Sequence, residues 1–178
     1  MKRLIVCTGL LFVAASVFAQ QKPAASPPAK ASASIGGKSI AISYSSPGVK
    51  GRAGQIFTKD GLISHNPHYP VWRAGANSAT ALHTEADIKI GDLAVPKGDY
   101  TLFVDISDPD NWVLIVSKKT GEWGLAYDPA QDLGKVKMKM SKPPALVEDL
   151  KYTIADLGGG KGRITLAWEN HSASVPVQ

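Results

Sequence analysis

The stretch from Val71 to Thr80 concentrates side chains that can hold a small polar ligand. Trp72 can stack on an apolar ring face, and the guanidinium of Arg73 can bind a carboxylate or a phosphate through two parallel hydrogen bonds. Asn77 offers both a donor and an acceptor, and Thr80 offers a hydroxyl. Small residues separate these groups, so a ligand can come close to the backbone. We therefore expect a binding site for a small polar ligand here.

Two residues outside this stretch extend the candidate site. His83 follows it on the same expected strand, and Trp123 lies in an aromatic loop that can form a second wall. The predicted ligand-binding residues are thus Trp72, Arg73, Asn77, Thr80, His83 and Trp123. The alternative is structural: the first tryptophan caps the core, the arginine pairs with Glu85 or Asp87, and the asparagine fixes a turn.

A hydrolase-type enzyme is a second alternative, and it rests on His83. Its best partner is Glu85 or Asp87, and alternate strand positions place His83 and Glu85 on one face. No Gly-x-Ser-x-Gly element marks a nucleophile. His65 and His68 raise the option of a metal-assisted reaction, but no ligand spacing typical of a metal site accompanies them. We therefore favour a binding protein over an enzyme, with no catalytic residue, metal or cofactor.

The N-terminus predicts export from the cytoplasm. A short basic start precedes an apolar run from Leu4 to Phe18, and residues 16–19 offer small residues for cleavage after Ala19. This is the pattern of a secretory signal peptide over residues 1–19. The run is too short to span a membrane comfortably, so we expect no membrane span in the mature chain. The only cysteine, Cys7, lies in this segment, so the mature protein has no disulfide. We expect a periplasmic or extracellular location.

Composition and hydrophobic period divide the rest of the chain. Residues 20–37 are rich in proline, alanine and serine and hold no large apolar residue before Ile35, which predicts a disordered linker. From residue 38 onward, apolar residues recur at every second position, and turn residues separate about eight to ten short segments of this kind. Residues 38–178 are therefore predicted to form one all-β domain, a single antiparallel β-sandwich or jelly-roll-like fold.

Charge excludes one class of partner and leaves another open. The formal net charge is +5, but no block of like charges is present, so we expect no nucleic-acid partner. Lysines alternate with apolar residues from Lys135 to Lys142, which indicates a surface strand that resists pairing with other chains. The same lysine face fits a polyanion. An envelope scaffold or interaction protein is therefore a third alternative.

Several motifs of the chain resemble one known family. The motifs are the string Trp-Arg-Ala-Gly-Ala-Asn-Ser-Ala-Thr at 72–80, the segments Pro96–Phe103 and Lys118–Gly124, and upstream Ser46–Arg52. Together they resemble the bacterial domain of unknown function 2911, from about residue 40 to 168. The resemblance implies an exported, mostly β domain of the bacterial envelope and implies no activity. The chain differs from the family in having Ser78 where an acidic residue is common, and in a longer loop before Trp72.

These observations combine into one expectation. The protein is predicted to be an exported β-sandwich that binds a small polar ligand or a component of the cell envelope. The predicted site is the Trp-Arg-x-Gly-Ala-Asn element that begins at Trp72.

Overall fold

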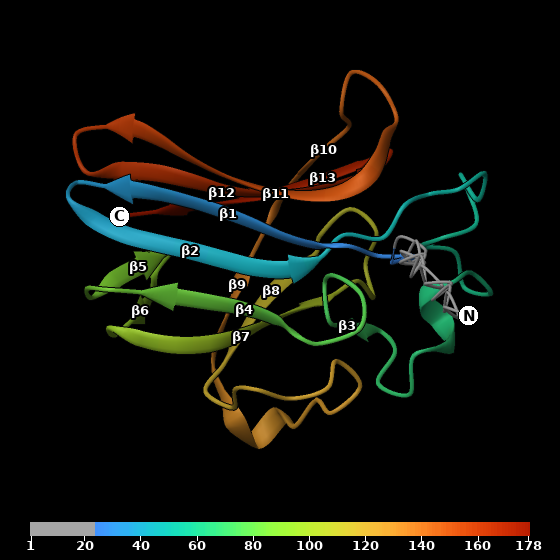
Figure 1. Cartoon of the computed structure of the whole chain (residues 1–178), viewed down its shortest axis with the longest axis horizontal. Coiled ribbons are helices and arrows are strands. Elements are labelled where there is room, and N and C mark those ends of the chain that lie inside the picture. The colour runs from blue at the N-terminus through green and yellow to red at the C-terminus, as the bar shows by residue number, and fades with distance from the viewer. Residues whose placement is uncertain (1–23) are drawn as a thin grey trace, which may run out of the picture.

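Two antiparallel β-sheets make up most of the described chain (Figure 1). The computed structural model describes residues 24–178, so the predicted signal peptide and the first residues of the predicted linker lie outside the described part. The first sheet has seven strands, with β3 (Val71–Trp72) pairing with β7 beside the main order β1 (Pro28–Ile35), β2 (Lys38–Ser45), β4 (Thr80–Thr84), β7 (Gly98–Asp105), β8 (Val113–Ser117) and β9 (Asp132–Lys137).

The second sheet has six strands and packs against the first. Its order is β11 (Val147–Gly158), β12 (Lys161–Glu169), β13 (His171–Val177), β5 (Ile88–Ile90) and β6 (Leu93–Val95), with β10 (Lys139–Ser141) also paired to β13. Two short 3-10 helices, η1 (Ile63–His65) and η2 (Pro129–Gln131), lie in the connections. Within the described residues 24–178, neither helix is long and apolar enough to cross a membrane. The predicted antiparallel β-sandwich is confirmed.

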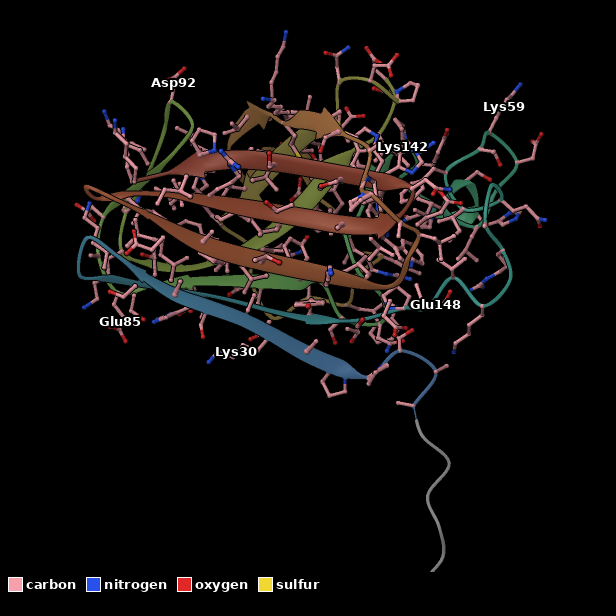
Figure 2. All side chains as sticks on the ribbon, turned by 90° about the horizontal axis from the view of Figure 1, so that it is seen from above. Lys30, Lys59, Glu85, Asp92, Lys142 and Glu148 are labelled. Carbon is pink, nitrogen blue, oxygen red and sulfur yellow. The ribbon has the colours of Figure 1, made fainter. Side chains whose placement is uncertain are left out.

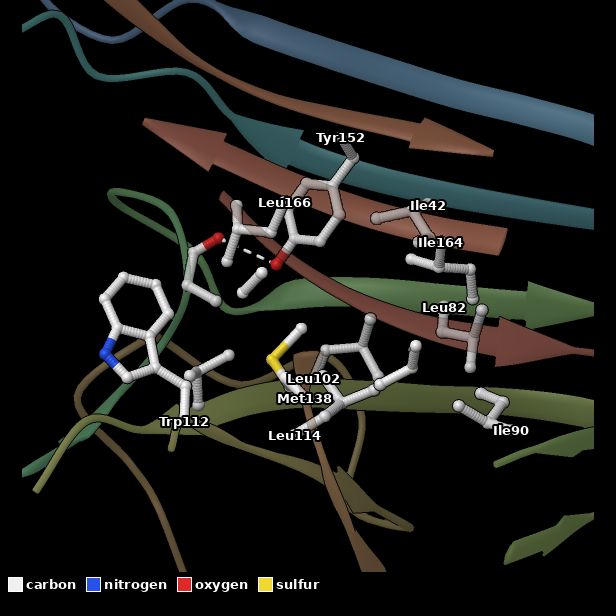
Figure 3. Packing of buried hydrophobic residues seen from close by; sticks show 14 of the residues in the cluster. Ile42, Leu82, Ile90, Leu102, Trp112, Leu114, Met138, Tyr152, Ile164 and Leu166 are labelled. Atoms are coloured by element: carbon white, nitrogen blue, oxygen red, sulfur yellow. Dashed lines mark hydrogen bonds between the residues drawn. The ribbon is translucent and has the colours of Figure 1, made fainter. Parts of the chain in front are cut away.

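Alternation of apolar and polar residues places the core between the two sheets. In β2, Ile40 and Ile42 are buried while Ser43 is exposed, because successive side chains of a strand point to opposite faces. Figure 3 shows side chains of both sheets meeting there, among them Leu82 of β4 and Ile164 of β12. The period-two pattern of the sequence therefore reflects one face packed on the core.

Residues 100–104 of β7 and 114–117 of β8 are buried on both faces, which explains why both segments are mostly apolar. Phe103 of β7 points away from the main core, and its ring lies 4.9 Å from that of Tyr127. Tyr127 belongs to the connection between β8 and β9, so this connection covers the outer face of the first sheet. Residues 122–124 of this connection contact the turn that follows β3.

The predicted linker is wrong over Pro28–Ile35, which forms β1 and pairs with β2 along its whole length. Ala31 and Ala33 pack against the core, and Ile35 is buried. The segment shows a period of two in which small alanines take the inward positions, and a search for large apolar residues does not detect it. The sandwich domain therefore begins before residue 38.

One other strand expectation needs correction. The lysine-bearing segment is not one strand, because the strand ends at buried Met138 and the chain passes from β9 in the first sheet to β10 in the second. The partner of β10 is β13, which lies in a distant part of the chain. The local pattern therefore does not reveal the change of sheet.

Candidate functional site

A cavity of about 560 Å³ opens at the end of the sandwich where η1 and β3 lie (Figure 1). Trp72 and Arg73 line it from β3 and the residue that follows. Lys50 and Arg52 line it from the loop after β2, and His65 lines it from η1. Segments far apart in the sequence therefore meet around the arginine of the predicted site.

Trp72 forms an apolar wall of this cavity and is itself part of the core. It is only 3% exposed, and its ring stacks on that of Trp168 with centroids 5.8 Å apart and planes at 22°. The ring of Phe57 meets both tryptophans edge-on at 5.6 and 5.7 Å. The indole nitrogen of Trp72 donates to the carbonyl of Gly75 at 3.2 Å, so the ring is fixed in place.

The turn that follows Arg73 is held from beneath at Ala74. The backbone of Ala74 has a φ of 49°, which a residue with a side chain seldom adopts. Its carbonyl accepts hydrogen bonds from the hydroxyls of Thr80 and Tyr152, both at 3.1 Å. Figure 3 shows the bond from Tyr152. Burial raises the pKa of Tyr152, so its hydroxyl remains a donor. These two bonds satisfy a buried carbonyl and hold the turn against the core.

The connection after β8 holds the same turn from the other side. Ala79 donates its backbone N–H to the carbonyl of Glu122 at 3.3 Å, and Gly124 donates to that of Asn77 at 3.2 Å. Gly124 lies so close that a Cβ there would overlap the Cδ of Arg73 and lie 2.6 Å from the Asn77 carbonyl oxygen. Only glycine fits at this position without displacing the arginine.

Arg73 has hydrogen-bonding capacity that the fold leaves unused. Its Nε and Nη1 are buried and have no hydrogen-bond partner among residues 24–178. Burial also lowers the pKa of the Arg73 guanidinium through loss of solvation, although an arginine stays protonated at any physiological pH. Buried donors without a partner cost about 1–3 kcal/mol each in general. The arginine therefore favours an anionic oxygen as a partner.

The other two cations of the cavity already have backbone partners. Lys50 donates from Nζ to the carbonyl of Ala25 at 2.8 Å, and Arg52 donates to the carbonyls of Val49 and Gly48 at 3.0 and 2.8 Å. Backbone carbonyls do not neutralise these positive charges. No aspartate or glutamate is among the described residues that line the cavity, and Glu148 meets Lys50 through the backbone N–H, so the lining itself is cationic.

The structure brings together only part of the predicted site. Trp72 and Arg73 line the cavity, but Thr80 is fully buried beneath the turn. Asn77 has a φ of 57° and directs its amide toward the Ser26 carbonyl at 3.5 Å. Trp123 is 58% exposed and is not among the residues that line the cavity. The structural interpretation of the asparagine, a residue that fixes a turn, fits its geometry.

His83 lies on the exposed face of β4, away from the cavity. Its Nδ1 is 2.7 Å from Oδ1 of Asp99 on the neighbouring strand, and both side chains are well exposed, at 49% and 70%. Asp87, the expected alternative partner, instead accepts the backbone N–H of Lys97 at 2.8 Å. Within residues 24–178, no group of three or more His, Cys, Asp or Glu side chains is placed to hold a metal ion.

The predicted site did not include the cationic loop that completes the cavity. Lys50 and Arg52 follow a proline and a glycine in an irregular segment, which by itself matches no phosphate-binding motif. The loop is positioned by a bond from the Lys50 backbone N–H to Oε1 of Glu148 at 2.7 Å. Such a contact across 98 residues has no local signal in the sequence.

Comparison with known proteins assigns a family and nothing beyond it. No curated protein and no solved structure matches the chain. A family model described as "Protein of unknown function (DUF2911)" matches residues 26–177, which include β1 and the whole of the sandwich. The resemblance seen in the motifs is thereby confirmed. This chain belongs to the DUF2911 family of proteins of unknown function.

Proposed function

We propose that this protein binds a small anionic ligand, a carboxylate or a phosphate ester, in the cavity at Arg73. The observation that carries the proposal is the pair of buried Arg73 nitrogens, Nε and Nη1, that have no partner among the described residues. Each of these N–H groups can donate a charge-assisted hydrogen bond to an oxygen of a carboxylate or phosphate. In keeping with the predicted leader, we propose that binding takes place outside the cytoplasm.

The surroundings of Arg73 support an anion over a neutral ligand. Lys50 and Arg52 add positive charge, and no acidic side chain among the described lining residues competes for it. Removal from water strengthens a charge-assisted hydrogen bond at the arginine. A bound carboxylate would satisfy donors that are buried whether or not the ligand is present, so part of the desolvation penalty is already met by the fold.

The shape and walls of the cavity define the rest of the ligand. A volume of about 560 Å³ lies in the range of sites for small organic molecules. Its apolar lining includes Leu62 and Leu125, which are partly exposed, beside Trp72 and Trp168, which are almost fully buried. We therefore propose a ligand that joins one anionic group to an apolar or ring-shaped body, which would lie against the exposed apolar side chains.

The test compares thermal shifts of purified protein with benzoate, phenyl phosphate, acetate and inorganic phosphate. We expect the two anions with a ring to raise Tm more than their small counterparts. The variant Arg73→Gln should lose these shifts with little loss of stability, because it removes two buried donors that have no partner among the described residues. The matched control is Arg163→Gln, which removes the same charge from an exposed position of β12.

Two outcomes would contradict the proposal. One is a ligand shift of equal size in wild type and in Arg73→Gln. The other is equal loss of the shift in the Arg163→Gln control, which would mean that net charge alone attracts the anion. A direct reading comes from the Nε–H resonance of Arg73 in an NMR spectrum, which should move downfield when a carboxylate accepts its proton.

A further inference from the structure

A second and larger cavity, of about 700 Å³, lies at the opposite end of the sandwich. It is formed where the turn between β5 and β6, the edge strand β9 and the hairpin between β11 and β12 come together. Figure 1 shows β5 and β6 at the end away from η1, and Figure 2 shows Asp92 of this region far from Lys59 and Lys142. The cavity is therefore separate from the one at Arg73.

Four lysines from three parts of the chain surround this cavity. They are Lys89 of β5, Lys135 and Lys137 of β9, and Lys161 at the start of β12. Among the described residues that line it, Asp92 is the one acidic side chain. Lys135 has a distant partner at 3.5 Å in Asp132, but its side chain is 53% exposed. The cavity thus carries an excess of positive charge that is free to meet an anion.

The floor of the same cavity is apolar and closely packed. A Cβ on Gly91 would lie 2.6 Å from Cγ1 of Val136, and one on Gly134 would overlap the side chain of Leu93. The β5–β6 turn therefore packs directly against β9. Leu157 stands beside this floor with 55% of its surface exposed, at the start of a glycine-rich hairpin. An exposed leucine among lysines gives the cavity both charged and apolar parts.

We propose that this lysine-rimmed cavity binds an anionic phospholipid at a membrane surface. The lysine ammonium groups would lie at the level of the phosphates, and Leu157 would enter the interface between headgroups and acyl chains. Charge complementarity selects an anionic partner. The exposed leucine and the apolar floor select an amphiphile over a soluble polyanion, which would leave these surfaces in water. The proposal is independent of the ligand at Arg73.

The test measures flotation of the purified full chain with vesicles of phosphatidylcholine, with and without phosphatidylglycerol. We expect binding to the anionic vesicles only, and weaker binding as salt is added. The double variant Lys135→Gln/Lys137→Gln should lower the partition coefficient by about 25-fold, since each lysine near an anionic surface contributes about fivefold. Leu157→Ser should lower it by about tenfold, because roughly half of that side chain remains to be buried.

The matched control is Lys59→Gln/Lys142→Gln, which removes two exposed lysines from the opposite end (Figure 2). This variant should bind the anionic vesicles as well as wild type does. Equal losses in both double variants would overturn the proposal, because they would show that net charge alone drives adsorption. Equal binding to neutral vesicles would overturn it too. So would lysine-dependent binding to polyglutamate that Leu157→Ser leaves unchanged, since that result identifies a soluble polyanion as the ligand.

Discussion

Gly124 lies directly against the side chain of Arg73, although 51 positions separate them in the sequence. A Cβ on Gly124 would overlap the Cδ of Arg73, and the Gly124 N–H is bonded to the carbonyl of Asn77 in the turn after the arginine. The covering connection therefore decides where the guanidinium lies. Two of the motifs that suggested the family, one containing Trp72 and one containing Gly124, thus contact each other in the folded protein.

Adding one methyl group at this contact should disturb both stability and binding. We expect Gly124→Ala to destabilise the protein by about 1–3 kcal/mol, the usual cost of overpacking a filled site, and to abolish the ligand shift by displacing Arg73. Urea unfolding and the thermal-shift assay measure the two effects. In the double variant Gly124→Ala/Arg73→Ala part of the clash is relieved, so the loss of stability should be smaller than the sum of the single losses. Strict additivity would contradict the contact.

The support beneath the turn should affect stability and leave ligand affinity intact. Thr80→Val and Tyr152→Phe each remove one of the two donors to the Ala74 carbonyl, and each should cost about 1 kcal/mol. The double variant leaves a buried carbonyl without a partner and should cost about 1–3 kcal/mol beyond the sum. Urea unfolding gives these values. Ligand affinity is measured at a temperature where the Thr80→Val variant is fully folded. A tenfold change in its dissociation constant would show that Thr80 does contribute to ligand binding.

Much of the fold was predictable because the strongest strands have a clear pattern of apolar residues in their own sequence. β2, β7 and β12 each alternate large apolar residues with polar ones or are apolar on both faces, and these patterns have few alternatives in a chain without helical period. The sheet order was not predictable, since it depends on pairings such as Val177 with Ile90. A two-residue strand such as β3 has too little sequence to carry a period.

The candidate site was only half predictable, for a related reason. The chemistry of Trp72 and Arg73 is readable from residue type, and both residues do line the cavity. Residue type does not tell whether a polar side chain serves a ligand or the backbone. Thr80 has the same hydroxyl in either role, and only the position of the Ala74 carbonyl shows that it holds the turn.

The pair formed by His83 and Asp99 should have no part in ligand binding. The two side chains face solvent on the outer face of the first sheet, and exposed pairs contribute less than about 1 kcal/mol. We expect His83→Ala and Asp99→Asn to leave the thermal shift with benzoate unchanged and to alter Tm only slightly. Loss of the shift in either variant, with the fold intact by circular dichroism, would restore His83 to the site that its sequence position suggested.

The strand β1 should prove to be part of the folded domain. Ala33 packs inward and Ser32 beside it points to solvent, so Ala33→Glu should destabilise the protein by about 1–3 kcal/mol through a poorly solvated charge, while Ser32→Glu should be nearly neutral. The two variants change net charge equally and sit one residue apart, so a difference in Tm can only come from the face they occupy. Equal and small effects of both would mean that the segment does not pack on the core in solution, and the original linker prediction would then describe it better than a strand does.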